Sequence, residues 1–132
     1  MCGIFGYVTN KEEAIGPILI EAAKRLTYRG YDSVGIATLN GGKIDLRKDI
    51  GKVEEVAAKY QFAEMRGSRG IVQLRWATFG EPSQLNAQPH LDTDGDLVGA
   101  GCPLLGVPLA LGRAILQAKA TCLVMSLACK EA

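Results

Sequence analysis

Apolar residues in the first 27 positions follow two different periods. Residues 3–9 are rich in aromatic and β-branched side chains, a composition that predicts a strand. Thr9 and Asn10 then precede two glutamates, as at a helix start. Apolar side chains recur at helical spacing at Ile15, Ile18, Leu19, Ala22, Ala23 and Leu26. We therefore expect a strand over 2–9 and a helix over 12–27 that stops before Gly30.

The next fifty residues add three strands and a second helix. Strands are predicted over 33–39 and 43–48, and the intervening Asn40-Gly41-Gly42 is a strong hairpin signal. A helix is predicted over 53–64 and a further strand over 71–77. The order β-α-β-β-α-β describes a mixed sheet with helices on a face, which is an α+β architecture.

The chain changes character after residue 98. Residues 1–98 carry 25 charged side chains, whereas residues 99–132 carry four. We therefore divide the chain into a first part, 1–98, and an apolar tail, 99–132, which we expect to pack on the same domain. Within the tail, 109–127 has the composition of a helix that needs burial on most sides. The uncharged stretch 97–112 is too short and too rich in proline to span a membrane.

Length and charge limit the classes of function. A chain of 132 residues fits one domain or a piece of a larger one. With 15 basic and 14 acidic side chains, the net charge of +1 gives no field that would attract nucleic acid or an acidic membrane. Four cysteines without a CxxC pair, beside a single histidine, do not suggest a zinc site. The start lacks the features of a secretory leader, so we expect a cytoplasmic protein without a disulfide framework.

Cys2 behind Met1 is the most informative single position. Removal of the initiator methionine would leave a thiol and a free α-amine on one residue. The amine has a reference pKa of about 7.7–8.0 and the thiol of about 8.5, so the amine can act as a base near neutral pH. One residue would then supply both nucleophile and base. On Cys2 alone, the favoured explanation is a cysteine that is merely buried in a strand.

Several longer motifs favour the chemical interpretation of Cys2. They are Cys2-Gly-Ile-Phe-Gly-Tyr-Val8, Leu26-Thr-Tyr-Arg-Gly-Tyr-Asp-Ser-Val-Gly-Ile-Ala37, Gly51-Lys-Val53, Arg75-Trp-Ala-Thr-Phe-Gly-Glu-Pro82 and Asn86-Ala-Gln-Pro-His90. In this order they closely resemble the glutaminase domain of glucosamine–fructose-6-phosphate aminotransferase. That domain is a class II glutamine amidotransferase on the N-terminal nucleophile hydrolase fold, an α-β-β-α sandwich. The resemblance covers residues 2 to about 98, and the tail departs from the family.

The resemblance implies a role for each matched position. Cys2 corresponds to the nucleophile that attacks the side-chain amide of L-glutamine. Arg75 corresponds to the arginine that binds the substrate α-carboxylate, Thr78 to a hydroxyl donor to it, and Trp76 to an aromatic residue that closes over glutamine. Arg29 and Gly30 fall where the family places backbone close to the nucleophile. The lone His90 is interpreted as a structural member of its loop. The resemblance implies no cofactor and no metal.

The sequence also departs from the family at positions that matter. Gln73, Phe79 and Gln88 stand where the family has histidines, and Val98-Gly-Ala-Gly-Cys102 replaces the region of the Asn-Gly pair that forms the oxyanion hole. Loss of one such donor typically slows a reaction by about 100- to 1000-fold. The aspartate that holds the substrate α-amine also has no counterpart, because no aspartate follows Asp96. We expect a poor glutaminase.

The chain is also shorter than the family's sandwich, and the sugar-phosphate isomerase domain that would be its partner is absent. An incomplete sandwich leaves an apolar sheet face that the tail, or association into a homo-oligomer, could cover. Two other hypotheses stay open on the sequence. One is a catalytically impaired, truncated paralogue that binds only glutamine or a protein partner. The other is a different class II branch, such as the phosphoribosylamine-forming enzyme, which the Tyr28-Arg-Gly-Tyr-Asp-Ser33 segment disfavours.

Overall fold

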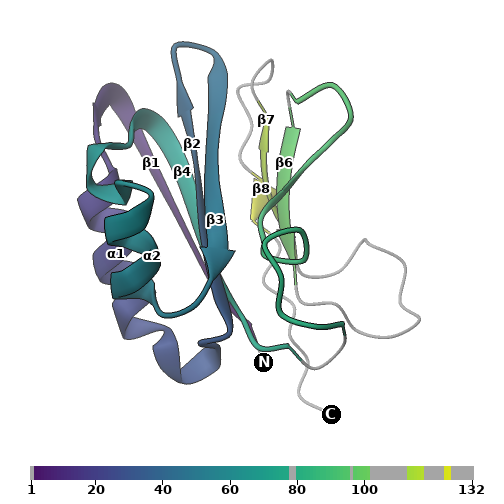
Figure 1. The fold of residues 1–132 in the computed structure, drawn as a ribbon. Helices are drawn as coiled ribbons and strands as arrows, with labels where there is room; N and C mark the ends of the chain where they lie inside the picture. The colour runs from purple at the N-terminus through teal and green to yellow at the C-terminus, as the bar shows by residue number, and fades with distance from the viewer. Residues whose placement is uncertain (1, 78–79, 96, 102–112, 118–123, 126–132) are drawn as a thin grey trace.

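Two antiparallel sheets and a pair of helices make up the described part of the fold. The computed structural model describes residues 2–77, 80–95, 97–101, 113–117 and 124–125, with side chains through residue 101. Sheet A has the strand order β1-β4-β2-β3, and sheet B the order β5-β6-β7-β8. Helices α1 (Gly16–Arg25) and α2 (Val53–Lys59) cover one face of sheet A, and sheet B faces the other (Figure 1). These are three layers, α-β-β, of the expected sandwich.

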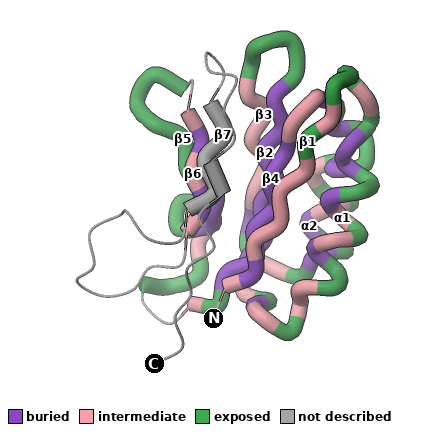
Figure 2. The backbone as a smooth tube through the Cα atoms, turned by 180° about the vertical axis from the view of Figure 1, so that it is seen from behind, coloured by how far each residue is buried: buried purple, intermediate pink, exposed green. Residues whose placement is uncertain are grey.

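The strands of sheet A come from both ends of the first 75 residues. They are β1 (Gly3–Ala14), β2 (Ser33–Asn40), β3 (Lys43–Ile50) and β4 (Arg66–Arg75). The hairpin between β2 and β3 turns at Gly41 and Gly42, whose φ angles are 55° and 76°, as the Asn-Gly-Gly signal predicts. The central strands β2 and β4 are buried along most of their length, as Figure 2 shows. The order β-α-β-β-α-β and the α+β class are confirmed, but the expected mixed sheet is wrong, because every strand pair of sheet A is antiparallel.

Sheet B is built from short strands. They are β5 (His90–Leu91), β6 (Leu97–Gly101), β7 (Arg113–Gln117) and β8 (Val124–Met125). Strand β7 pairs with β6 along its whole length, from Leu97↔Gln117 to Gly101↔Arg113. The helix expected over 109–127 is therefore wrong for 113–117 and for 124–125, and the rest of that range lies outside the described residues. A short apolar run does not distinguish helix from strand by period, and pairing with the edge of β6 decides the outcome.

The first predicted helix begins four residues late. Strand β1 continues through Ala14 because its end pairs with the start of β4, at Glu13↔Gly67 and Ala14↔Arg66. The helix then starts at Gly16, whose N–H donates to Met65 O at 3.0 Å. The residue before it, Ile15, provides no side-chain cap, so the expected start at Thr9 and Asn10 is wrong.

The second predicted helix is divided. Helix α2 ends at Lys59, and a separate 3₁₀ turn, η2 (Phe62–Glu64), follows. Gln61 lies between them in the left-handed region, with φ of 53°, which interrupts the helical path. Arg47 stabilises this break, because its Nη1 donates to Tyr60 O at 2.8 Å and to Gln61 O at 3.0 Å.

Two apolar clusters hold the layers together. The larger lies between the helices and sheet A and consists of Ile15, Leu19, Ala23, Val34, Ile36, Val53, Val56, Phe62, Met65, Val72 and Leu74. The smaller contains Ala37, Leu39 and Ile71 of sheet A with Val98 and Ala100 of sheet B. Side chains alternate between these two faces along each strand of sheet A. This alternation identifies the face on which each residue of the site lies.

Candidate active site

The site lies at the end of sheet A where β1 begins and β4 ends. Gly3 pairs with Leu74, so one step further along each strand brings Cys2 opposite Arg75. On the other side of β4, Arg75 pairs directly with Ser33 at the start of β2. We call these three residues the Cys2–Arg75–Ser33 row. It joins residues that are more than 70 positions apart in the sequence.

The row faces the space between the two sheets. Ile4 packs against the inter-sheet cluster and Phe5 against the helix-side cluster, so the alternation puts Cys2 on the inter-sheet face. Arg75 shares that face with Ile71, because the two residues lie four positions apart on β4. Arg75 is 4% exposed and Ser33 is fully buried, whereas Cys2 is half-buried and forms no disulfide with any described residue.

Gly30 brings a second backbone segment against this end of β4. It follows the 3₁₀ turn η1 (Thr27–Arg29). A Cβ on Gly30 would lie 2.7 Å from Arg75 C and 2.8 Å from Trp76 N, so only glycine permits the approach. The Arg29 guanidinium lies over the exposed Tyr28 ring, 5.2 Å from its centre. Arg29 therefore adjoins Gly3 through its Cβ, which would lie 3.2 Å from a Cβ at that glycine, while its guanidinium contacts Tyr28.

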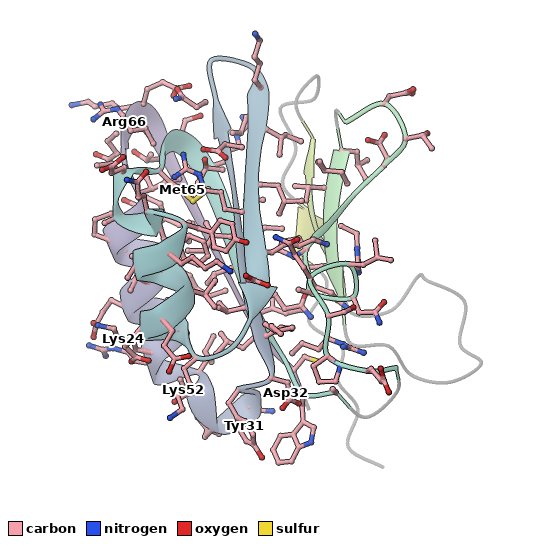
Figure 3. All side chains as sticks on the ribbon, viewed as in Figure 1. Lys24, Tyr31, Asp32, Lys52, Met65 and Arg66 are labelled. Carbon is pink, nitrogen blue, oxygen red and sulfur yellow. The ribbon has the colours of Figure 1, made fainter. Side chains whose placement is uncertain are left out.

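The exit from β4 is fixed by Asp32. Its N–H donates to Arg75 O at 3.2 Å, and its Oδ2 accepts a hydrogen bond of 2.6 Å from the Ala77 N–H. Trp76, 41% exposed, contacts the Tyr31 ring with centres 5.5 Å apart. Tyr31 and Asp32 lie together at this end of sheet A in Figure 3. The expected role of Thr78 falls on a residue outside the described ranges.

Arg75 also contacts the loop that follows. Its Nη2 donates to Gly80 O at 3.2 Å, so the guanidinium is held by backbone while its charge stays in the inter-sheet space. A planar, permanently charged guanidinium is suited to bind a carboxylate through two parallel hydrogen bonds. Burial strengthens such an interaction, because little water competes for the donors.

Polar residues beyond the motif positions complete this end of the inter-sheet space. The Ser33 hydroxyl is buried and has no hydrogen-bond partner among the described residues. Gln73, two residues before Arg75 on the same face, donates from Nε2 to Gly101 O at 3.0 Å. Gln88 accepts from the Gly101 N–H at 2.9 Å. The sequence marks both glutamines as departures from the family, but it does not show that they share a partner.

His90 lies beside the half-buried Lys48. Its Nδ1 is 3.3 Å from Lys48 Nζ, which donates to Ala87 O at 2.5 Å. Loss of hydration lowers the pKa of His90, and the charges of Lys48 and Arg75 lower it further. Burial also lowers the pKa of Lys48. The neutral form of the His90 imidazole is therefore favoured, and Lys48 ties its loop to β3.

The part of the chain that the structure describes has neither a cluster of metal ligands nor a membrane-spanning helix. No three histidine, cysteine, aspartate or glutamate side chains gather there as metal ligands. None of the helices in those ranges has the length and apolar character needed to cross a bilayer.

Comparison with solved structures identifies the fold. The chain resembles a structure titled glutamine phosphoribosylpyrophosphate amidotransferase from B. subtilis, complexed with ADP and GMP. The TM-score is 0.57 at 23% identity, over 76% of this chain and 21% of that one. A structure titled as the allosteric regulatory enzyme of purine biosynthesis gives a TM-score of 0.62 at 26% identity, over 75% and 21%. No family model matches the chain.

Over its first three quarters the chain has the fold of these two solved structures. Its sequence over the same part is similar to that of glutamine–fructose-6-phosphate aminotransferases. The protein of Pyrococcus horikoshii is 47% identical over 98 residues, and that of Sulfolobus acidocaldarius 49% over 98. Each match covers 74% of this chain and 16–17% of the relative, so the chain spans about one sixth of the relatives' length.

Proposed function

We propose that this chain is the glutaminase part of an amidotransferase and releases ammonia from L-glutamine through Cys2. The Cys2–Arg75–Ser33 row supports the proposal, because continuing the register of β1 with β4 by one residue brings Cys2 opposite the buried Arg75. Glutamine has a side-chain amide at one end and an α-carboxylate at the other. A nucleophile and a carboxylate clamp in one row match those two ends.

The reaction begins at the α-amine of Cys2 once Met1 is removed. The amine takes the thiol proton, and sulfur attacks the amide carbon to give a tetrahedral intermediate. The amine then returns the proton to the amide nitrogen, the carbon–nitrogen bond breaks, and ammonia leaves a thioester. Water attacks the thioester, the carbon–sulfur bond breaks, and glutamate and the thiol are released.

Arg75 is proposed to bind the α-carboxylate, with the Thr78 hydroxyl as a second donor. Trp76 is proposed to close over the substrate, since it is partly exposed and directly follows the clamp. The Arg29–Gly30 backbone supports the same end of the site, because Gly30 packs on the Arg75–Trp76 peptide. Without the family's Asn-Gly pair and α-amine aspartate, we expect turnover well below the typical enzyme median of roughly 10 per second.

The use of the released ammonia and the partner domain are proposed from the names of the relatives. An isomerising aminotransferase for fructose 6-phosphate would use the ammonia for amino-sugar synthesis, with the sugar-phosphate isomerase domain as partner. We propose that residues 99–132 belong to the same domain as residues 1–98, which the pairing of β6 with β7 supports. A cytoplasmic location and self-association through an uncovered sheet face also stay predictions. The non-catalytic alternative is not favoured, because Cys2, Arg75 and Trp76 are present and the sequence relatives are aminotransferases.

Glutamine binding can be measured separately from turnover. Trp76 is the only tryptophan of the chain, so intrinsic fluorescence reports the loop beside Arg75. We expect L-glutamine to change this fluorescence in the wild type and in Cys2→Ala, but not in Arg75→Ala. Intact mass first establishes whether Met1 is removed.

Glutamate release from glutamine then tests the chemistry. We expect slow release from protein that lacks Met1, and none from Cys2→Ala. Binding without any release from correctly processed protein would contradict the catalytic proposal. Release at several per second, abolished by Cys2→Ala, would contradict the expected impairment.

A further inference from the structure

Two buried glutamines hold the same residue of sheet B. Gln73, on β4, is fully buried and donates from Nε2 to Gly101 O at 3.0 Å. Gln88, 8% exposed, accepts from the Gly101 N–H at 2.9 Å. Gly101 is the last residue of β6. We call Gln73, Gly101 and Gln88 the glutamine bridge.

The glutamine bridge adjoins the Cys2–Arg75–Ser33 row. Gln73 is one pleat from Arg75 on the same face of β4, and it pairs with Ile4 on one side and Gly35 on the other. Gly35 leaves room for the loop of Gln88, since a Cβ there would overlap the Gln88 carbonyl oxygen. The bridge therefore crosses from sheet A to sheet B beside the nucleophile.

Packing alone does not explain this polar contact. Farther along the same inter-sheet space, Ala37, Leu39, Ile71, Val98 and Ala100 join the sheets by apolar contact. An apolar side chain at position 73 would continue that packing. Instead, Gln73 is buried with Oε1 lacking a hydrogen-bond partner among the described residues, which is destabilising. Such a departure from good packing is typical of a functional site.

We propose that Gln73 and Gln88 are positioning residues that hold the end of β6 opposite Cys2 and so set the far wall of the site. This inference rests on the proposed glutaminase function. Sheet A alone carries Cys2 and Arg75, so substrate affinity depends on β4. The wall opposite the nucleophile limits water and orients the amide under attack, so its loss affects the chemical step.

Gln73 uses its amide nitrogen as a donor and Gln88 uses its amide oxygen as an acceptor, and this difference makes the proposal testable. Gln88 contributes an acceptor oxygen, which Gln88→Glu retains, beside the cationic Lys48 that contacts the same loop. Gln73 contributes a donor nitrogen, which Gln73→Glu replaces with an oxygen that cannot donate while ionised. The same chemical change is therefore expected to be tolerated at 88 and damaging at 73.

The measurement is the rate at which Cys2 is alkylated by a glutamine analogue with a chloromethyl ketone in place of the amide. The thiolate displaces chloride and forms a thioether, which intact mass detects. At pH 8 we expect at least a tenfold lower saturating rate for Gln73→Glu and for Gln88→Leu, and less than a threefold change for Gln88→Glu. The dissociation constant of glutamine, from Trp76 fluorescence, should change less than threefold in all three.

The matched control is Ile71→Val, one pleat from Gln73 in the apolar part of β4. It should lower thermal stability and leave the alkylation rate unchanged. Equal losses in Gln73→Glu and Gln88→Glu, or a comparable loss in Ile71→Val, would overturn the proposal. Gln73→Met, which also lacks a donor, replaces Gln73→Glu if that variant does not fold.

Amide hydrogen exchange at Gly101 separates this inference from the proposed function. Gln88→Leu should speed exchange of the Gly101 N–H whether or not glutamine binds. If the wild type is not alkylated, the glutaminase proposal and this positioning role both fail, even if exchange shows the bridge. If the wild type is alkylated and the glutamine variants match it, only the positioning role fails.

Discussion

The two faces of sheet A are filled in different ways. The helix-covered face is packed along its length by aliphatic and aromatic side chains from α1, α2 and η2, with Phe62, Ile15 and Leu19 fully buried. The inter-sheet face is apolar only toward the β2–β3 hairpin. At its other end it carries Cys2, Ser33, Gln73 and Arg75.

This difference separates stability from function. Burial of apolar side chains stabilises a fold, whereas buried polar groups cost free energy unless every hydrogen bond is made. The polar end of the inter-sheet face includes groups with open hydrogen-bonding capacity, Ser33 Oγ and Gln73 Oε1, among the described residues. We infer that the helix face maintains the fold and that the polar end is kept for a ligand.

The largest expected effect is on stability, at the helix face. Phe62→Ala should lower the free energy of unfolding by about 3–5 kcal/mol, because it removes a fully buried ring and leaves a cavity. Urea denaturation followed by circular dichroism measures this change. The protein that remains folded should bind glutamine with unaltered affinity by Trp76 fluorescence. A large loss of affinity there would show that the two faces are not independent.

The next effect is on binding, at the inter-sheet face. Arg75→Lys keeps the positive charge but loses the paired donors, so glutamine binding should weaken by about 2–3 kcal/mol, or about 30- to 150-fold. Fluorescence titration gives the dissociation constant. Arg47→Lys is the matched control, because Arg47 pairs with Asp45 and with backbone at the outer edge of sheet A. Equal weakening in both variants would contradict the assigned clamp.

A smaller effect on the free energy of unfolding is expected at Asp49, a buried carboxylate whose hydrogen bonds are satisfied. Lys59 Nζ lies 2.7 Å from its Oδ2, and Tyr60 OH donates to the same atom at 3.0 Å. The hydrogen bond from Lys59 holds the pKa of Asp49 below its usual 3.8, against the opposing effect of burial. Asp49→Asn should cost about 1–2 kcal/mol at pH 7 and leave glutamine affinity unchanged.

The pH dependence of this effect has a definite sign. Since the folded pKa of Asp49 lies below the unfolded value, its contribution is full above about pH 4 and is lost as the pH falls through the folded pKa. The stability difference between wild type and Asp49→Asn should therefore shrink on acidification below pH 4. A difference that grows there, in denaturation curves at several pH values, would contradict this assignment.

How far the sequence predicts this molecule depends on how local each feature is. The Asn40-Gly41-Gly42 turn and the order of elements follow from neighbouring residues, and they are confirmed. The helix start at residue 12 was wrong because the pairing of Ala14 with Arg66 depends on a strand more than fifty positions away. The assignment of 109–127 to a helix failed for 113–117 for the same reason, since β6 supplies the partner.

The residues of the candidate site also fall into two groups: those that local sequence motifs identify and those that only the packing of the sheets brings together. Cys2 and Arg75 could be selected because their motifs are contiguous in the sequence. Gln73 and Gln88 could be recognised only as departures from a family pattern, because their common partner, Gly101, is brought to them by the packing of two sheets. The unsatisfied hydroxyl of Ser33 could not be predicted either, because the sequence of a strand does not show which hydrogen-bond partners a serine will have.

The smallest expected effect tests the comparison most directly, at two buried hydroxyls on opposite faces of β2. Ser33 and Thr38 are both fully buried, and neither hydroxyl has a hydrogen-bond partner among the described residues. Ser33 pairs with Arg75 and lies on the inter-sheet face, whereas Thr38 shares the helix face with Val34 and Ile36. Removing a buried, unsatisfied hydroxyl should stabilise the protein by up to about 1 kcal/mol at either position. Ser33→Ala and Thr38→Val should therefore both raise the denaturation midpoint, but only Ser33→Ala should weaken glutamine binding, by a few-fold. If both variants bind glutamine as the wild type does, the open hydroxyl of Ser33 is a packing defect and not part of the site.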